Sequence, residues 1–263
     1  MRRSGRLLLL ALLAGCLARP VPKPRIVAST TLISTIIREV AGDRFAVTTI
    51  APAGLCPGHF DLKPSDITAV NGAKLLLSHG WEPWYPALEK AIVPPGPHRV
   101  ILRTKGNWMV PSVHAAATAE LTSLLCQLDP SDSARYQANA RRYLAQVESV
   151  SAIVKGLFPN RNLPAVIASD NQAPFLEWLG FRVVARYGRP EEFTAQELSR
   201  LAQLMVDSSV GLVVDNLQSG PDAGKPLAEA AQARHVTLTN FPLTGSYLES
   251  LLANGRALAQ ALP

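Results

Sequence analysis

Residues 133–157, SARYQANARRYLAQVESVSAIVKGL, carry the longest helical pattern of the chain. Apolar side chains recur three or four residues apart, and neither glycine nor proline interrupts the segment before Gly156. These side chains are Tyr136, Ala140, Tyr143, Leu144, Val147, Val150 and Ile153. A rise of about 1.5 Å per residue makes such a helix roughly 40 Å long, enough to cross a whole domain. We therefore expect it to join two parts of the molecule.

On both sides of this segment, short apolar runs alternate with stretches of helical spacing. The runs cover residues 25–29, 45–50, 74–78 and 99–103 before it, and 165–168, 181–186, 210–214 and 236–238 after it. This alternation is typical of βαβ units, which build parallel sheets. The sequence predicts an α/β protein with two lobes, each with a mostly parallel sheet flanked by helices, joined by one long rigid helix. We expect an N-terminal lobe at 25–111, linking helices at 112–159 and a C-terminal lobe at 160–263.

The composition supports a folded protein without a nucleic-acid partner. Hydrophobic residues make up 48% of the 263 residues and charged residues only 17%, so the chain can bury a core. The formal charge is +6, but a chain that starts at Cys16 keeps 23 basic against 20 acidic residues, a charge of +3. Its lysines and arginines are scattered and do not cluster with aromatic residues, so nucleic-acid binding is not expected.

The first residues predict export and lipid anchoring. Residues 1–15 contain a basic start, the apolar run 7–13 and two small residues, which is typical of a signal peptide. The run is shorter than the roughly 20 residues that span a bilayer. Leu13-Ala-Gly-Cys16 resembles a bacterial lipobox, in which the cysteine is acylated; the alternative is an ordinary signal peptide with a chance cysteine. The proline-rich residues 16–24 are expected to form a lipid-anchored tether. The predicted location is a membrane surface facing the periplasm or the cell exterior.

Two cysteines remain in the exported chain. In an oxidising compartment Cys56 and Cys126 can form a disulfide, and the alternative is two independent thiols. Their spacing alone does not decide between the two, because a bridge requires the Cα atoms to be within reach of each other.

Polar side chains follow four of the predicted strands. They are His59 after 45–50, His79 after 74–78, residues 169–172 after 165–168, and Asp215 after 210–214. In open α/β sheets, ligands bind outside the carboxyl ends of the strands. Imidazole and carboxylate groups are also common metal ligands, although a loop histidine or a turn aspartate is ordinary by itself. Together these groups favour a binding site in a cleft between the lobes.

Several motifs resemble one family, the zinc- and manganese-type metal-binding lipoproteins of ABC importers, which are substrate-binding proteins of cluster A-I. The resemblance covers nearly all of the exported chain and suggests a divergent member. Its motifs are the lipobox, His59-x-x-x-x-Pro64-Ser65-Asp66-Ile67, AKLLLSHGWEPW at 73–84, LDPSDSARYQAN at 128–139, and Tyr247 with Asn254.

The resemblance implies a binding protein and not an enzyme. Such a protein captures a divalent metal ion, zinc or manganese, in the cleft and delivers it to a membrane permease. In the family four side chains, two from each lobe, hold the metal; His59 falls on the first ligand position and Asp215 on the last. The family's second histidine is replaced here by residues 105–111, KGNWMVP, and its third ligand by residues 169–172, SDNQ.

Other residues of this chain are candidates for the two unmatched positions. His79 is the candidate from the first lobe, and Gln172 or Asp170 from the second. A set of His59, His79, Asp215 and one such oxygen ligand would suit zinc and manganese about equally. His114, on the helix after Trp108, is a further candidate, although a histidine on a helix is more often structural.

Three other functions fit parts of the sequence. The same scaffold can bind a non-metal nutrient or a metal chelate, because half of the family's ligand set is unmatched. Lipid anchoring also allows a cell-adhesion role, as an adhesin. An exported hydrolase is disfavoured, since the chain has neither a Gly-x-Ser-x-Gly nor a His-Glu-x-x-His motif. The expected partners are an ABC permease and the membrane, through the lipid, and the expected state is a monomer.

Overall fold

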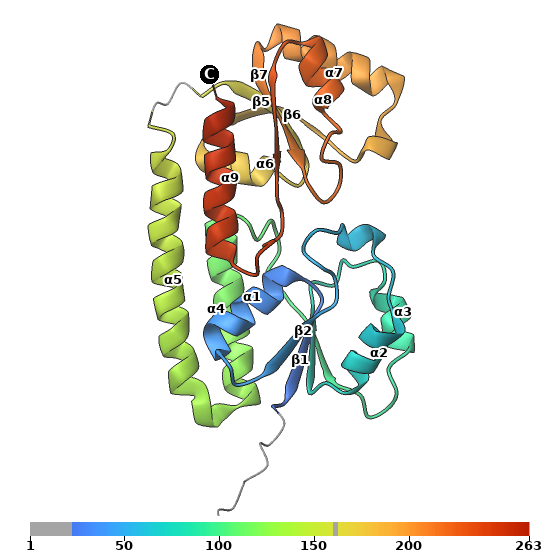
Figure 1. Ribbon diagram of the computed structural model, residues 1–263, viewed down its shortest axis with the longest axis vertical. Helices are drawn as coiled ribbons and strands as arrows, with labels where there is room; N and C mark the ends of the chain where they lie inside the picture. Colours follow the sequence, from blue (N-terminus) through green and yellow to red (C-terminus); the bar gives the residue numbers. More distant parts are fainter. Residues whose placement is uncertain (1–22, 160–162, 263) are drawn as a thin grey trace, which may run out of the picture.

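The computed structural model describes residues 23–159 and 163–262, and shows two α/β lobes beside a layer of long helices (Figure 1). The leader predicted at 1–15 and the predicted lipid site Cys16 lie outside the described residues. Within the described part of the chain, no helix is both long enough and apolar enough to cross a membrane.

The first lobe contains a parallel four-stranded sheet in the order β2-β1-β3-β4. Its strands are β1 (Arg25–Ala28), β2 (Ala46–Thr49), β3 (Leu75–Ser78) and β4 (His98–Ile101), and its helices are α1 (Thr31–Ala41), α2 (Pro64–Asn71) and α3 (Tyr85–Lys90). Helix α1 covers one face of the sheet, and α2 and α3 cover the other. Because both faces are covered, the central strand β3 is buried along its whole length.

The second lobe repeats this arrangement, with a parallel sheet in the order β6-β5-β7-β8. Its strands are β5 (Ala165–Ser169), β6 (Arg182–Tyr187), β7 (Val210–Asn216) and β8 (Arg234–Leu238), and its helices are α6 (Ala173–Leu179), α7 (Ala195–Asp207) and α8 (Lys225–Ala230). In each sheet the chain first adds a strand on one side and then crosses to the other. The switch points therefore lie between β1 and β3 and between β5 and β7.

Three helices form a layer that runs beside both lobes (Figure 1). They are α4 (Pro111–Leu128), α5 (Ser133–Gly156) and α9 (Tyr247–Ala261), and α5 packs against α1, α4 and α9. The predicted long helix at 133–157 is confirmed, as is the two-lobe α/β fold. The buried face of this helix differs from the prediction by one position, since Val154 is buried while Ile153 is 53% exposed.

Gly255 lets α9 approach α5, because a Cβ there would lie 2.7 Å from Val154 Cγ1.

One hydrophobic cluster is continuous through both lobes and the helical layer. It includes Ile26 of β1, Tyr143 of α5, Leu251 of α9 and Val166 of β5. A separate cluster fills the far side of each sheet. Because the lobes share one core, we expect them to move only slightly relative to each other.

The candidate ligand His114 belongs to this core. Its Nε2 lies 2.8 Å from Tyr143 Oη, and its ring stacks on Tyr247 at a centroid distance of 3.5 Å. Burial lowers the pKa of His114 to about 3, so the ring is neutral at pH 7. Tyr247 Oη in turn donates to the carbonyl of Met109. These contacts join the three helices of the layer, and His114 is structural.

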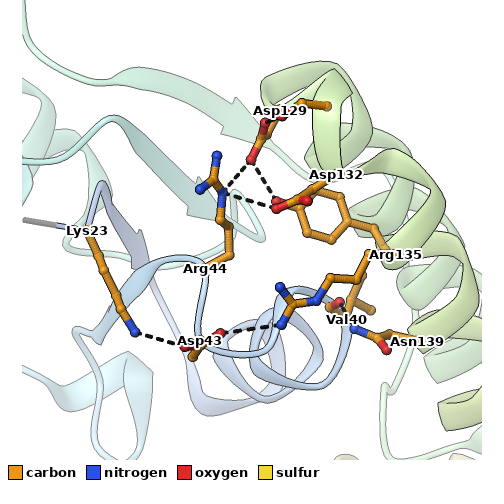
Figure 2. A network of polar contacts seen from close by, with 10 residues as sticks. Lys23, Val40, Asp43, Arg44, Asp129, Asp132, Arg135 and Asn139 are labelled. Atoms are coloured by element: carbon orange, nitrogen blue, oxygen red, sulfur yellow. Dashed lines mark hydrogen bonds and ion pairs between the residues drawn. The ribbon is translucent and has the colours of Figure 1, made fainter. Parts of the chain in front are cut away.

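Polar contacts hold the start of α5 to the first lobe (Figure 2). Arg44 Nε donates to Asp129 Oδ2 at 2.7 Å and lies 3.2 Å from Asp132 Oδ2. Asn139 Nδ2 donates to the carbonyl of Val40 at 2.9 Å. The hydrogen bond from Arg44 lowers the pKa of Asp129 to about 2. The linking helix is thus anchored at its first turns by charged groups and along its length by the core.

Candidate functional site

A cavity of about 430 Å³ lies between the two lobes, at the carboxyl ends of their strands. Side chains of both lobes line it, including His79 after β3, Asn171 after β5 and Asn216 at the end of β7. The switch points of the two sheets therefore face one cleft, as the strand-end pattern predicts.

Each switch point is bridged by one buried side-chain pair. In the first lobe, Thr30 Oγ1 lies 2.9 Å from His79 Nε2. In the second lobe, Gln172 Nε2 donates to Asn216 Oδ1 at 2.8 Å. All four residues are buried. The pairs occupy corresponding places in the two sheets, because each joins the segment after the first strand to the carboxyl end of the third.

His79 is held in a mostly apolar setting. Its ring stacks on Trp81 at a centroid distance of 5.2 Å and meets the edge of Trp108 at 4.6 Å. Burial lowers its pKa to about 4, against the opposing charge of Glu82, whose carboxylate accepts from the backbone N–H groups of His79 and Gly80. His79 is therefore neutral at pH 7. Since Thr30 engages Nε2, Nδ1 is the ring nitrogen left to coordinate a ligand.

His59 lies in a 3₁₀ turn, Pro57–His59, and its side chain is 59% exposed. Arg189, from the second lobe, places Nη1 2.9 Å from His59 Nε2 and donates through Nη2 to Cys56 Sγ at 3.6 Å. A guanidinium only donates, so His59 Nε2 must supply its lone pair to Arg189. A metal ion at Nε2 would have to displace this arginine.

The structure corrects the placement of Asp215, which lies inside the second lobe and is fully buried. It accepts hydrogen bonds from Tyr187 Oη at 2.7 Å, from the backbone N–H of Gly224, and from His235 Nε2 at 2.6 Å. Side chains alternate along β7, so Asp215 shares the face of Val213, while Asn216 points to the other side. The residue that lines the cleft is Asn216.

The remaining candidate residues do not complete a metal site either. Gln172 is fully buried, bonded to Asn216 and to the carbonyl of Leu238. Cys56 and Cys126 are free thiols, with Cys56 beside Arg189 and Cys126 beside the carbonyl of Ser133, so the suggested disulfide is not formed. Among the residues that the structure describes, no group of three or more His, Cys, Asp or Glu side chains is placed to hold a metal ion. The four-ligand set of His59, His79, Asp215 and Gln172 is not assembled.

Amide and indole side chains are prominent in the lining of the cleft. The amides are Asn107, Asn171, Asn216, Gln218 and Asn240. Trp81 and Trp108 form an aromatic wall, and the charged lining groups are Asp170 and Arg189. Sequence reasoning missed Arg189, Gln218 and Asn240. The last two follow β7 and β8 and so continued the strand-end pattern, whereas no local signal distinguishes Arg189.

Several side-chain contacts cross the cleft, and one of them brings Glu191 Oε1 of the second lobe to 3.6 Å from His59 Nε2. Besides Arg189 and His59, Asn107 Nδ2 donates to the carbonyl of Asn171, and Gln218 Nε2 donates to the carbonyl of Ala53 at 3.0 Å. Residues from both lobes thus enclose the cavity, which is the geometry of a two-lobe α/β solute-binding protein.

Comparison with known proteins names the family. The model of the family ZnuA, described as zinc-uptake complex component A periplasmic, matches residues 26–261, and the chain belongs to this family. The predicted resemblance is confirmed. The family is one of extracytoplasmic metal-binding components of importers, and it supports the expectations of a binding protein, a divalent metal as cargo and an extracytoplasmic location.

The relatives found by sequence are distant or matched over short stretches. The manganese-binding lipoprotein MntA of Halalkalibacterium halodurans is 24% identical over 200 residues, which cover 69% of this chain and 67% of that protein. The uncharacterized protein RP014 of Rickettsia prowazekii is 40% identical over 55 residues, which cover 21% of this chain. That second match spans only 18% of the relative's own length.

Solved structures share the fold at low sequence identity. A crystal structure of ZnuA superposes with a TM-score of 0.78 and 18% identity, covering 91% of this chain and 99% of that chain. A manganese-bound point mutant of the periplasmic metal-binding protein from Candidatus Liberibacter asiaticus superposes with a TM-score of 0.80 and 17% identity. The match covers 92% of this chain and 100% of that chain. A cadmium-bound form of that protein superposes with a TM-score of 0.78 and 18% identity, and the match covers 90% of this chain and 99% of that chain.

Proposed function

We propose that this protein is the extracytoplasmic binding component of an ABC importer, and that it captures a divalent metal, zinc or manganese, in the cleft and delivers it to a permease. The observation that carries the proposal is the cavity between the switch points of both lobes, to which both lobes contribute polar side chains, in a member of a zinc-uptake family. The relatives described as manganese-binding or manganese-bound support the choice of cargo.

The residues that line the cleft fit a hydrated or free divalent ion poorly. Zinc is bound by imidazole, thiolate and carboxylate groups, and manganese favours carboxylate and other oxygen ligands. Among the described residues that line this cavity, the only carboxylate is Asp170, and the guanidinium of Arg189 shares the same space. His79 Nδ1 is the best placed nitrogen ligand. For a metal cargo we propose His79 as the contact in the first lobe and Asp170 as the candidate in the second.

The proposed metal capture is tested by measuring how much metal stays bound to the protein during gel filtration. Metal-stripped protein is incubated with zinc or manganese in a filtrate of its own growth medium, which supplies natural small ligands, and bound metal is quantified by mass spectrometry after gel filtration. We expect about one metal per chain, reduced in Asp170→Asn and unchanged in Asp222→Asn, an exposed aspartate of the same lobe outside the cavity. Failure of either metal to co-elute with the protein would refute the proposed function.

We further propose that residues 1–15 are removed and that Cys16 is acylated, so that the protein stays at a membrane near its permease. The motif at 13–16 supports this, as does the apolar run that precedes it. In cell fractionation, Cys16→Ser should move the exported protein from the membrane to the soluble fraction. A wild-type protein recovered only in the soluble fraction would contradict the lipid anchor.

A further inference from the structure

We infer that the cleft recognises a carboxylate group through Arg189, so that the metal cargo enters as a complex with a carboxylate-bearing small molecule. The inference rests on the proposed function, because it specifies the chemical form of the cargo in the same cleft. Its starting point is that the chain belongs to a family of metal-binding proteins, whereas few of the side chains that line this cavity are metal ligands.

The position of Arg189 is the first observation. It lies just before the turn Pro190–Glu192, and its guanidinium reaches across the cleft to the first lobe. Within residues 23–159 and 163–262, no carboxylate forms an ion pair with it. Two contacts, to His59 and Cys56, use part of its five N–H donors, and the rest can bind a carboxylate in the bidentate geometry that guanidinium groups favour.

The same arginine disfavours a bare cation. It contacts His59 Nε2 and Cys56 Sγ, which are the two groups of that loop with lone pairs suited to zinc. A divalent ion at either atom would face the guanidinium charge at close range, where repulsion is strong, and at His59 Nε2 the opposing charge is the exposed carboxylate of Glu191 at 3.6 Å. A metal carried by a carboxylate ligand has a neutral or negative total charge, and for such a complex the guanidinium is attractive.

The size and lining of the cavity point the same way. Its volume of about 430 Å³ is in the range of small-molecule pockets. A single water molecule takes roughly 30 Å³ of liquid, so an ion alone would leave most of the space to solvent. The wall of Trp81 and Trp108 offers apolar surface for a carbon skeleton, with Trp81 51% exposed.

Asn240 adds an unsatisfied polar group. It lines the cavity, and its Oδ1 is buried without a hydrogen-bond partner. Amide oxygen and nitrogen can exchange places by a flip of the side chain, but in either orientation a buried polar atom next to the cavity is left without a partner. Amides across the cleft, such as Asn107 and Asn171, are neutral groups that suit hydroxyl and carboxylate oxygens.

The test uses thermal stabilisation and titration calorimetry of the metal-stripped exported chain at pH 7. The probes are zinc chloride alone, three carboxylates alone (citrate, malate and histidine), and the equimolar zinc complex of each. We compare wild type with Arg189→Gln and with the matched control Arg186→Gln, an exposed arginine of the same lobe that pairs with Glu177 outside the cavity.

We expect at least one zinc complex to bind more tightly than zinc alone. Arg189→Gln should weaken that binding by roughly tenfold to a hundredfold, the usual effect of losing charged hydrogen bonds, and Arg186→Gln should leave it unchanged. The same Arg189→Gln change should strengthen binding of zinc alone, because it frees His59 and Cys56. A variant with a damaged fold should bind every probe more weakly. Weaker binding of the zinc complex together with stronger binding of zinc alone would therefore not be explained by such damage.

The outcomes separate the inference from the function on which it rests. A free carboxylate that binds as well as its zinc complex, and loses affinity in Arg189→Gln, would support carboxylate recognition but overturn metal as the cargo. A second outcome would overturn the inference and leave the proposed function standing: zinc alone binds tightly, citrate removes it from the protein, and Arg189→Gln has no effect on its affinity. Binding of none of the probes would overturn both.

Discussion

The two switch points have the same topology and different chemistry. Each sheet places the segments after its first and third strands side by side, and each closes the gap with one buried hydrogen bond, Thr30 to His79 in one lobe and Gln172 to Asn216 in the other. The first pair contains an imidazole and the second contains only amides. The repeated fold determines where a ligand can bind, and the individual side chains determine what kind of ligand it is.

The second lobe has a strand-end carboxylate but turns it away from the cleft. Asp215 faces Tyr187, Gly224 and His235, while the second lobe reaches the cleft with the cation Arg189. Among the described residues, Asp170 is the one carboxylate of the second lobe that lines the cavity, so a site with two carboxylate or imidazole ligands from each lobe lacks a ligand there. This difference between the lobes is the physical reason for a carboxylate-bound cargo in a metal-binding family.

The largest effect is expected from Asp215→Ala. The change leaves the N–H of Gly224 and His235 Nε2 without their acceptor, and leaves Tyr187 Oη only the carbonyl of Val214; buried unpaired groups of this kind are costly. We expect a loss of about 3 kcal/mol or more in the free energy of unfolding, measured by urea denaturation. Asp222→Asn should change it by less than about 0.5 kcal/mol.

This experiment also decides whether Asp215 is structural. At temperatures where the variant is still folded, it should bind cargo as the wild type does. Normal stability combined with lost binding would instead make Asp215 a ligand of the cleft.

Between the two bridging pairs, a pH effect of intermediate size is expected only from the pair of the first lobe, because it alone contains a histidine. The pKa of His79 is about 4 in the folded state against 6.5 for an ordinary histidine, so the unfolded chain binds a proton first as the pH falls. Its contribution to stability is complete above pH 6.5 and is lost between pH 6.5 and 4, with about 2 kcal/mol lost at pH 5.

The comparison is between the pH profiles of unfolding for His79→Gln and the wild type, both metal-stripped. Since His114 and other groups titrate in both proteins, their contribution cancels in the difference. A difference that stays constant from pH 7 to 4.5 would show that His79 is not held neutral by burial.

The smallest effects should come from breaking the two bridging bonds in turn. Thr30→Val leaves His79 Nε2 unpaired, and Gln172→Met leaves Asn216 Oδ1 without its donor from the neighbouring segment; both changes keep the side-chain size. Each should cost about 1–2 kcal/mol of unfolding free energy in urea. Together they should cost the sum of the two, because the bonds lie in different lobes and share no partner. Strong non-additivity would mean that the two switch points are coupled through the cleft.

Much of the fold could be predicted because its signals are local. The spacing of Tyr136, Tyr143 and Val147 predicts α5, and the apolar runs ending at Ser78 and Val214 predict strands β3 and β7. Even here one detail needed the structure, since Val154 and not Ile153 faces the core. Adjacent residues of a helix or strand can be distinguished only by what packs against them.

The sequence by itself determined that polar groups follow strands in both halves, that one helix links the halves, and that the family's ligand residues are only partly present. The tertiary structure decided which of two neighbours, Asp215 or Asn216, faces the cleft, because the alternation along a strand is local but its direction depends on the packed sheet. It also decided that Arg189 meets His59 from 130 residues away. Contacts between lobes depend on how distant segments pack, and no spacing pattern records them.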